Sequence, residues 1–180
     1  PELLGARVQL RPVAPHDHQW LYENAVATGA GHRWRLHGLV PGPDAFLAGF
    51  YDGAAASLMV ERRDPLESIG VIQLWNLDQL SRTGQLNVFI ADDFQGLGWP
   101  MEGLVLATRF VFEAYDLRKL YAEVLQPQMA NFESLVGWAL EREGLLRAHR
   151  YVMGDLVDCH VLAIYRDRYE ELSEGWSTIR

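Results

Sequence analysis

Hydrophobic and polar residues follow two different periods along this chain, and the change between the periods marks its elements. Residues 7–13 alternate between apolar and polar side chains, the period-two pattern of a strand with one buried face. Residues 101–115 instead carry apolar side chains at helical spacing. The pattern predicts strands at 7–13, 57–61, 68–75, 84–91 and 119–125, a final hairpin at 144–153 and 156–166, and helices at 15–26, 44–50, 100–115 and from Asn131 onward.

The remaining segments predict one domain. Residues 27–43 are rich in glycine and proline and predict a long loop, and residues 170–180 a tail. The chain shows no repeat, linker or low-complexity segment, so residues 1–180 are expected to form a single domain. With 180 residues, 49% of them hydrophobic, the chain can bury one core. A long helix between strands, with hairpins on both sides, predicts an α/β (α+β) fold with a mixed sheet.

A glycine turn at residues 95–100, Gln-Gly-Leu-Gly-Trp-Pro, separates the strand at 84–91 from the long helix. Glycine allows a tight turn and a close approach to a ligand, because no Cβ stands in the way. The helix that follows directs its free N–H groups and its positive dipole end at the turn, which favours phosphate. Pro100 is expected at the first helical position. The alternative is an ordinary strand-to-helix loop. The sequence of the turn matches neither a Walker loop nor a Rossmann fingerprint.

The turn resembles the acetyl-CoA pyrophosphate loop of the GNAT superfamily of N-acetyltransferases, Gln/Arg-x-x-Gly-x-Gly/Ala. Gln95 and Gly98 match this motif, and Pro100 departs from it. Further segments follow in family order across residues 6–169, and the closing hairpin is similar to the Rim (ribosomal-protein alanine acetyltransferase) branch. These segments are Leu10-Arg11-Pro12 with Asp17, the helix start with Trp99, Glu102 and Ala107, Tyr121-Ala122-Glu123-Val124 through Asn131 and Ser134, and residues 141–147 and 154–158.

The resemblance implies a GNAT fold, a mostly antiparallel sheet flanked by helices whose two central strands splay apart. It implies acetyl-CoA as co-substrate, with the pantetheine arm bonded to the strand that holds Val88, Phe89 and Ile90. The cofactor-binding residues it implies are these three with Gln95, Gly96, Leu97, Gly98, Trp99, Met101 and Asn131. Ser134, three residues after Asn131, matches the Rim serine and is the candidate acid for the departing thiolate, with a small polar residue at a helix start as the alternative. Trp138 stands where many relatives carry a tyrosine, and indole cannot act as an acid.

The general base is not assigned by this resemblance. Gln85 occupies the place of a glutamate that some family members use, and Arg150 the place of another. A water held by backbone carbonyls, or Asp78, His37 or His149, could substitute.

The acceptor is expected beside the 27–43 loop, because this segment lines the mouth of the cleft in the family's fold. Arg33, Trp34, Arg35 and His37 form its densest polar and aromatic cluster. They predict a grip on a carboxylate or phosphate of the acceptor, with solvated loop charges as the alternative. Gln85 is the fifth candidate substrate-binding residue.

The net charge of the chain limits the classes of molecule that it is expected to bind. A formal net charge of −8 disfavours loose binding to nucleic acid or an anionic membrane and tolerates a cationic amine. Cys159 is the only cysteine and is expected to be a buried, inert thiol, and a cytoplasmic location is expected. The six histidines include His16 and His18, but no cluster has metal-site spacing, so no metal is expected. Arg118 and Lys119 are expected in an ordinary solvated turn.

Two classes of function remain. The first is a CoA-dependent acyltransferase that moves an acetyl group to a primary amine: a protein N-terminus, an aminosugar or an antibiotic amine. The second is a GNAT-like domain that binds acyl-CoA without turnover, as a sensor or interaction module. An unrelated phosphate-binding α/β protein is a third reading, and a homodimer is left open.

Overall fold

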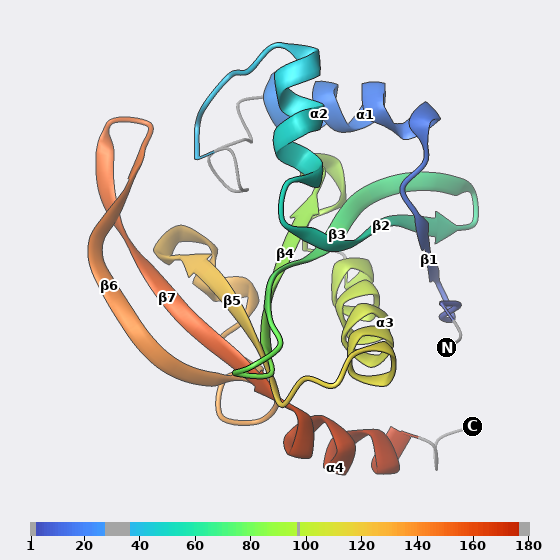
Figure 1. The fold of residues 1–180 in the computed structure, drawn as a ribbon, viewed down its shortest axis with the longest axis vertical. Coiled ribbons are helices and arrows are strands. Elements are labelled where there is room, and N and C mark those ends of the chain that lie inside the picture. Colours follow the sequence, from blue (N-terminus) through green and yellow to red (C-terminus); the bar gives the residue numbers. More distant parts are fainter. Residues whose placement is uncertain (1–2, 28–36, 97, 177–180) are drawn as a thin grey trace. The chain divides into compact units, whose positions relative to one another are not determined.

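The computed structural model describes residues 3–27, 37–96 and 98–176. Within them seven strands form one sheet in the order β1-β2-β3-β4-β5-β7-β6 (Figure 1). The β1–β2, β2–β3, β5–β7 and β6–β7 pairs are antiparallel, and β4–β5 is parallel. The predicted mixed, mostly antiparallel sheet flanked by helices is therefore confirmed.

The strands are β1 (Val8–Pro12), β2 (Ala54–Arg63), β3 (Leu66–Asp78), β4 (Thr83–Ile90), β5 (Lys119–Leu125), β6 (Glu141–Val152) and β7 (Asp155–Tyr165). The α-helices are α1 (His18–Tyr22), α2 (Pro43–Tyr51), α3 (Trp99–Ala114) and α4 (Arg166–Trp176). Short turns of 3₁₀ or π-helix are η1 (Pro15–Asp17), η2 (Glu23–Ala27), η4 (Asp92–Phe94) and η5 (Gln126–Asn131). No described helix is long and apolar enough to cross a bilayer.

The chain divides into two interleaved compact units. Unit 1 comprises Pro1–Leu77 and Leu86–Tyr115, and unit 2 comprises Asp78–Gln85 and Asp116–Arg180. The β4–β5 ladder covers Thr83–Gln85 opposite Lys119–Tyr121 and lies entirely in unit 2. The expected splaying of the central strands concerns parts of β4 and β5 that belong to different units, and it stays a prediction.

In unit 1, helices cover both faces of β2 and β3. Met59 and Val71 belong to a core with Phe46 and Phe50 of α2. Their sequence neighbours Val60 and Ile72 face the other side, because side chains alternate along a strand, and there they lie against Gly103 of α3. Figure 1 accordingly shows α1 and α2 on one side of these strands and α3 on the other.

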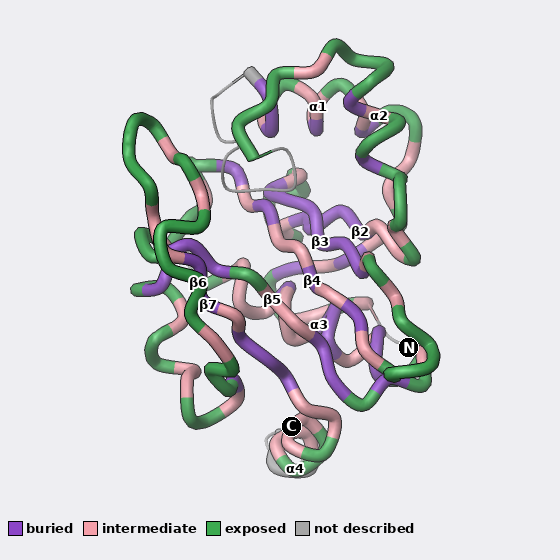
Figure 2. The backbone as a smooth tube through the Cα atoms, turned by 60° about the vertical axis from the view of Figure 1, so that its left-hand side comes forward, coloured by how far each residue is buried: buried purple, intermediate pink, exposed green. Residues whose placement is uncertain are grey.

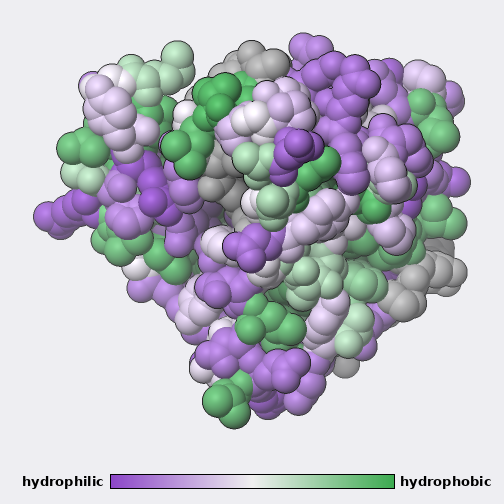
Figure 3. Space-filling view, turned by 45° about the horizontal axis from the view of Figure 1, so that its top comes forward, coloured by the Kyte–Doolittle hydropathy of each residue, from purple (hydrophilic) through white to green (hydrophobic). Residues whose placement is uncertain are grey.

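In unit 2, β5 and β7 carry the buried residues, and β6 is exposed over most of its length (Figure 2). The core there includes Leu120, Val124, Met129 and Leu162. On the surface drawn in Figure 3, hydrophobic and hydrophilic side chains are interspersed.

Two predicted boundaries of helices in unit 1 shift by a residue or two. Gly42 rather than Asp44 is the N-cap of α2, and Asp44 lies in its first turn. Gly98 is the N-cap of α3, so Trp99 takes the first helical position and Pro100 the second. Either position suits proline, whose missing N–H has no helical partner in the first turn.

In unit 2, the prediction of a helix opening at Asn131 is wrong. Asn131 ends η5, and hydrogen-bonded turns follow it as far as Leu140. Gly137 adopts a left-handed conformation (φ 83°), which leaves only five residues between Asn131 and that reversal. Such a segment is too short for a helix without a face to bury.

The predicted tail at 170–180 is also wrong over residues 170–176, which belong to α4. Arg166 anchors the helix by donating from Nε to the Leu117 carbonyl at 2.6 Å. Ion pairs Arg166–Glu170 and Arg168–Glu171 add support at helical spacing.

Candidate functional site

The turn between β4 and α3 has the geometry of an anion site. Gly96 and Gly98 have φ angles of 74° and 77°, which only glycine adopts without strain. Gly98 is the N-cap of a 16-residue helix, so the free N–H groups of the first turn of α3 lie beside it. The side chain of Gln95 supports the turn, with Nε2 donating to the Ile90 carbonyl at 3.4 Å and to Asp92 Oδ1 at 3.1 Å.

Aromatic side chains close one side of this turn. The rings of Phe94 and Trp99 are 6.1 Å apart, and the Arg62 guanidinium lies 5.5 and 5.7 Å from their centroids. Arg62 also forms an ion pair with Glu67. Trp99 thus serves as a packing partner of Arg62, which orders the end of the turn.

The backbone of β4 is oriented by its contact with β3. A Cβ on Gly70 would lie 2.3 Å from the Phe89 carbonyl oxygen, and the Ala91 N–H donates to the Ile69 carbonyl at 3.0 Å. Phe89 and Ala91 therefore direct backbone groups at β3. Because backbone groups alternate along a strand, Val88 and Ile90 direct theirs at the opposite edge of β4. Of the three residues expected to bond pantetheine, these two have the suitable orientation.

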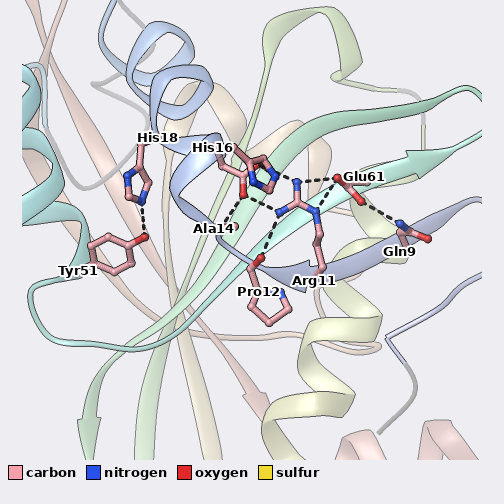
Figure 4. A network of polar contacts seen from close by, with 9 residues as sticks. Gln9, Arg11, Pro12, Ala14, His16, His18, Tyr51 and Glu61 are labelled. Atoms are coloured by element: carbon pink, nitrogen blue, oxygen red, sulfur yellow. Dashed lines mark hydrogen bonds and ion pairs between the residues drawn. The ribbon is translucent and has the colours of Figure 1, made fainter.

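The histidine pair near the start of α1 does not form a metal site. Asp17 lies between them and is buried, and it accepts hydrogen bonds from Arg11 at 2.6 and 2.8 Å and from the Ala14 N–H at 2.8 Å. His18 instead forms a hydrogen bond with the Tyr51 hydroxyl (Figure 4). The chain described here contains no group of three potential ligands that could hold a metal.

Arg11 instead joins β1, β2 and the start of α1 (Figure 4). Its Nε donates to Glu61 at 2.8 Å, and Glu61 in turn accepts from Gln9 at 2.9 Å. The hydrogen bonds from Arg11 hold the pKa of Asp17 below its ordinary value, although burial opposes this. Two carboxylates around Arg11 raise the pKa of its guanidinium. The Arg11 and Asp17 pattern noted in the sequence is therefore a structural network.

In unit 2, Asn131 and Ser134 are both exposed and lie three residues apart in the turns after η5. No side-chain hydrogen bond joins Ser134 to another described residue. Trp138 is also exposed, and its carbonyl accepts from Arg168 at 2.6 Å. Ser134 is thus accessible, and its catalytic role stays a prediction.

The expected acceptor residues lie only partly in the described chain. Arg33, Trp34 and Arg35, like Leu97 of the cofactor set, fall outside the described residues. His37 is exposed with a left-handed backbone (φ 50°). Gln85 is half-buried and ends the parallel ladder opposite Tyr121.

Two of the substitute bases lie in exposed places with structural neighbours. Asp78 caps its own turn, accepting from the backbone N–H groups of Leu80 and Ser81 at 2.9 Å, and hydrogen bonds from Ser81 lower its pKa. His149 belongs to an irregular stretch of β6 between Leu146 and Arg150, where Asp158 accepts from the Ala148 N–H at 2.7 Å.

The prediction of a solvated turn at Arg118 and Lys119 is wrong for Lys119, which is buried. Its ammonium donates to both oxygens of Glu143 at 2.9 and 3.0 Å and lies 4.4 Å from the centre of the Tyr121 ring. The Tyr165 hydroxyl also donates to Glu143. The partners lie 24 and 46 residues further along the chain, so local sequence gave no signal for them.

Burial and hydrogen bonding compete at this cluster. Burial would raise the pKa of Glu143, but hydrogen bonds from Tyr165 and Lys119 bring it below the ordinary value. Burial likewise opposes the charge on Lys119, but its hydrogen bonds raise its pKa overall. The cluster therefore holds a stable ion pair that joins β5, β6 and β7.

Cys159 is confirmed as a buried free thiol. Burial, with the charge of Glu123, raises its pKa, so it carries little thiolate.

The family model of the GNAT acetyltransferase domain matches residues 7–132, which include the glycine turn and the elements from β1 to η5. The chain belongs to the GNAT acetyltransferase family. The GNAT resemblance seen in the sequence is thereby confirmed.

Among curated proteins, an uncharacterized N-acetyltransferase, YoaA of Bacillus subtilis (strain 168), is 28% identical over 109 residues. That match covers 61% of this chain and 62% of YoaA, so it spans under two thirds of the relative.

Two solved structures share the fold. One is spermidine N-acetyltransferase from Vibrio cholerae in complex with CoA and spermine, with a TM-score of 0.76, 18% identity and coverage of 92% of this chain and 99% of that one. The other is ribosomal-protein-S5-alanine acetyltransferase from Vibrio fischeri, with a TM-score of 0.71, 14% identity and coverage of 94% and 98%.

Proposed function

We propose that this protein transfers an acetyl group from acetyl-CoA to a primary amine in a ternary complex. The observation that carries the proposal is the left-handed Gly98 N-cap of α3, in a chain of the GNAT family. A helix N-terminus with open amides suits the pyrophosphate of CoA, and the backbone groups that Val88 and Ile90 direct away from β3 suit the pantetheine amides. The solved relatives include enzymes named for transfer to spermidine and to ribosomal protein S5, which are both amine acceptors.

The reaction forms one bond and breaks another. The amine nitrogen attacks the thioester carbonyl carbon, the C–S bond breaks, the amine loses a proton and the departing thiolate takes one. We assign the second proton to Ser134 on the family resemblance, which its exposed position supports because a reacting hydroxyl must be accessible. Holding both substrates in place supplies much of the remaining rate.

The proton that the amine loses needs an acceptor. At the two positions where family members carry a glutamate base, this chain has Gln85 and Arg150. Arg150 is also ion-paired with Glu123 at 3.3 Å. We propose that the amine reacts as its neutral form and that water removes the proton. A lysine-type amine with a pKa of about 10.4 would then give a turnover rate that rises with pH up to that value. A rate that instead levels off near pH 6–7 would identify a protein base.

For the acceptor, Arg33 and Arg35 are proposed to hold an anionic group beside the amine. Arg33→Ala and Arg35→Ala should each raise the KM for the acceptor and leave the KM for acetyl-CoA unchanged. An unchanged acceptor KM, or a higher KM for acetyl-CoA alone, would contradict this role.

Release of free thiol from acetyl-CoA tests the proposal. Amines of three kinds should be compared with a reaction that contains no acceptor: polyamines, peptides with a free N-terminus, and aminosugars. We expect release that depends on one class of amine, with an acetylated product of matching mass. Tight binding of acetyl-CoA without acceptor-dependent release would instead support the non-catalytic acyl-CoA-binding module.

The free, buried Cys159 suits a reducing compartment, and we propose a cytoplasmic location.

A further inference from the structure

Arg7 lies beside the glycine turn although it is far from it in sequence. A Cβ built on Gly98 would lie 3.7 Å from Nη2 of Arg7 and 3.9 Å from Nη1. The Arg7 side chain is 58% exposed, so these two nitrogens are accessible from solvent. Both Arg7 and the turn belong to unit 1.

Glu102 fixes the direction of this guanidinium. Its Oε1 accepts from the Arg7 backbone N–H at 2.9 Å and its Oε2 from Arg7 Nε at 3.2 Å. Glu102 is largely buried in the first turn of α3, and Gly5 makes room for it, since a Cβ there would lie 2.2 Å from Oε1. The carboxylate holds Nε and leaves Nη1 and Nη2 without a hydrogen-bond partner among the described residues.

Two further arginines lie near Arg7. Arg7 is joined to Arg63 on the neighbouring strand, whose N–H donates to the Arg7 carbonyl at 2.8 Å. Arg62 lies against Trp99 at the other end of the same turn. In a protein of net charge −8, Arg7, Arg62 and Arg63 thus lie together at the paired ends of β1 and β2, where Arg62 is ion-paired with Glu67 and Arg63 donates to the Gly5 carbonyl.

We propose that Arg7 binds the pyrophosphate of coenzyme A through Nη1 and Nη2. This inference rests on the proposed function, since it assumes that the turn before α3 receives CoA. A guanidinium suits the role because two parallel N–H donors match two phosphate oxygens. Glu102 positions Arg7, in the way that an outer carboxylate orients a ligand-binding side chain.

The test measures the affinity for CoA by calorimetry in the wild type, in the variants Arg7→Ala, Arg7→Lys and Glu102→Gln, and in one control variant. Arg82→Ala is the matched control, because Arg82 is an exposed arginine that pairs with a carboxylate, Asp116, outside the turn. Arg7→Ala should weaken CoA binding about ten- to a hundredfold, the loss expected for a hydrogen bond between charged groups. Arg7→Lys, which keeps the charge but lacks the fork, should lose less. Arg82→Ala should match wild type.

Glu102→Gln separates ligand binding from a purely structural tie. If Arg7 only fastens β1 to α3, loss of either partner should weaken CoA binding to the same degree. If Arg7 binds phosphate, Glu102→Gln should weaken CoA binding less than Arg7→Ala does, because it loosens the direction of the guanidinium but keeps its positive charge and removes a negative charge near the phosphates. Melting curves check that each variant is folded, and Arg7→Lys carries the test if Arg7→Ala is not.

Two fragments of the cofactor identify the phosphate. Dephospho-CoA keeps the pyrophosphate and lacks the 3′-phosphate, and pantetheine lacks all phosphates. Arg7→Ala should weaken CoA and dephospho-CoA equally and leave pantetheine unaffected. An effect that vanishes with dephospho-CoA, or an equal loss in Glu102→Gln or Arg82→Ala, would overturn the proposal. Failure of the wild type to bind CoA would instead contradict the proposed function itself.

Discussion

Two segments of this protein begin alike and end differently. In unit 1, β4 leads through a glycine turn into α3, and in unit 2, β5 leads through η5 toward Ser134. Both resemble a strand followed by a helix start in the sequence. Only the first forms a helix, of 16 residues, whereas the second continues as turns.

The placement of glycine and the supply of a buried face explain the difference. Gly98 lies before its helix, where a left-handed residue ends the turn, and α3 then buries Leu106, Val111 and Phe112. Gly137 lies six residues after Asn131 and reverses the chain before a second helical turn can form. A glycine before an amphipathic stretch thus leaves a helix whose N-terminus suits an anion. A glycine inside a short stretch prevents the helix from forming, and with it such an N-terminus. We therefore propose that the first segment provides affinity for the cofactor and, by the family resemblance, that the second contributes to turnover.

The largest effect should come from Ser134→Ala, which tests the turnover half of this comparison. Loss of a general acid typically lowers the rate on the order of a hundredfold to ten-thousandfold. Steady-state kinetics should show a lower kcat with an unchanged affinity for CoA. Ser173→Ala in α4 is the control, because the Ser173 hydroxyl donates to the Glu170 carbonyl of its own helix. Near-normal turnover in Ser134→Ala would make Ser134 a turn residue.

A large loss of stability is expected for Lys119→Met, because the Lys119–Glu143 ion pair joins β5 to β6 and the Lys119 side chain is buried. Removing one partner leaves the Glu143 carboxylate partly buried without its cation, at a cost of about 3 kcal/mol. Urea unfolding should show this loss, and the double variant with Glu143→Gln should recover part of it. Single and double variants of equal stability would show that Lys119 acts independently of Glu143.

Gly98→Ala and Gly137→Ala form a matched pair that compares the two segments directly. Each places a side chain at a left-handed position, which costs about 1–2 kcal/mol of stability. Among the described residues other than the chain neighbours, none has an atom within 4 Å of a Cβ on Gly137 and only Arg7 has one near Gly98, so crowding adds little. Only Gly98→Ala should weaken CoA binding. Equal CoA affinities of the two variants would remove the distinction between the segments.

The smallest effect should appear in mild acid. The pKa of Asp17 in unit 1 and of Glu143 in unit 2 are both lowered in the folded protein. Their stabilising contributions are therefore complete above the unfolded values of about 3.9 and 4.3, and they fall as the pH drops from about 5 through the folded values. Urea midpoints from pH 7 to pH 3 should fall less steeply in Asp17→Asn than in wild type. Parallel curves for the two proteins would contradict this linkage.

The sequence located strands in both units and the long helix of unit 1, but it failed for the segment after η5 in unit 2. Alternation and helical spacing located β1, β4 and α3 to within a residue or two, because each has a single buried face, and β5 in unit 2 was located correctly. The glycine turn was recognisable because glycine has a specific backbone role. The charged contacts could not be recognised from the sequence, because Arg7 and Glu102 are 95 residues apart and Lys119 and Glu143 are 24 residues apart. Pairs of this kind depend on tertiary structure, for which local patterns carry no signal.

Hydrogen exchange with and without coenzyme A tests the central claim most directly, because it reads the backbone amides of both segments in one protein. Pyrophosphate bound at the start of α3 should slow exchange of the backbone amides in residues 96–102, apart from Pro100, which has no N–H. Unchanged exchange across residues 96–102 at saturating CoA would contradict the account, wherever else protection appeared.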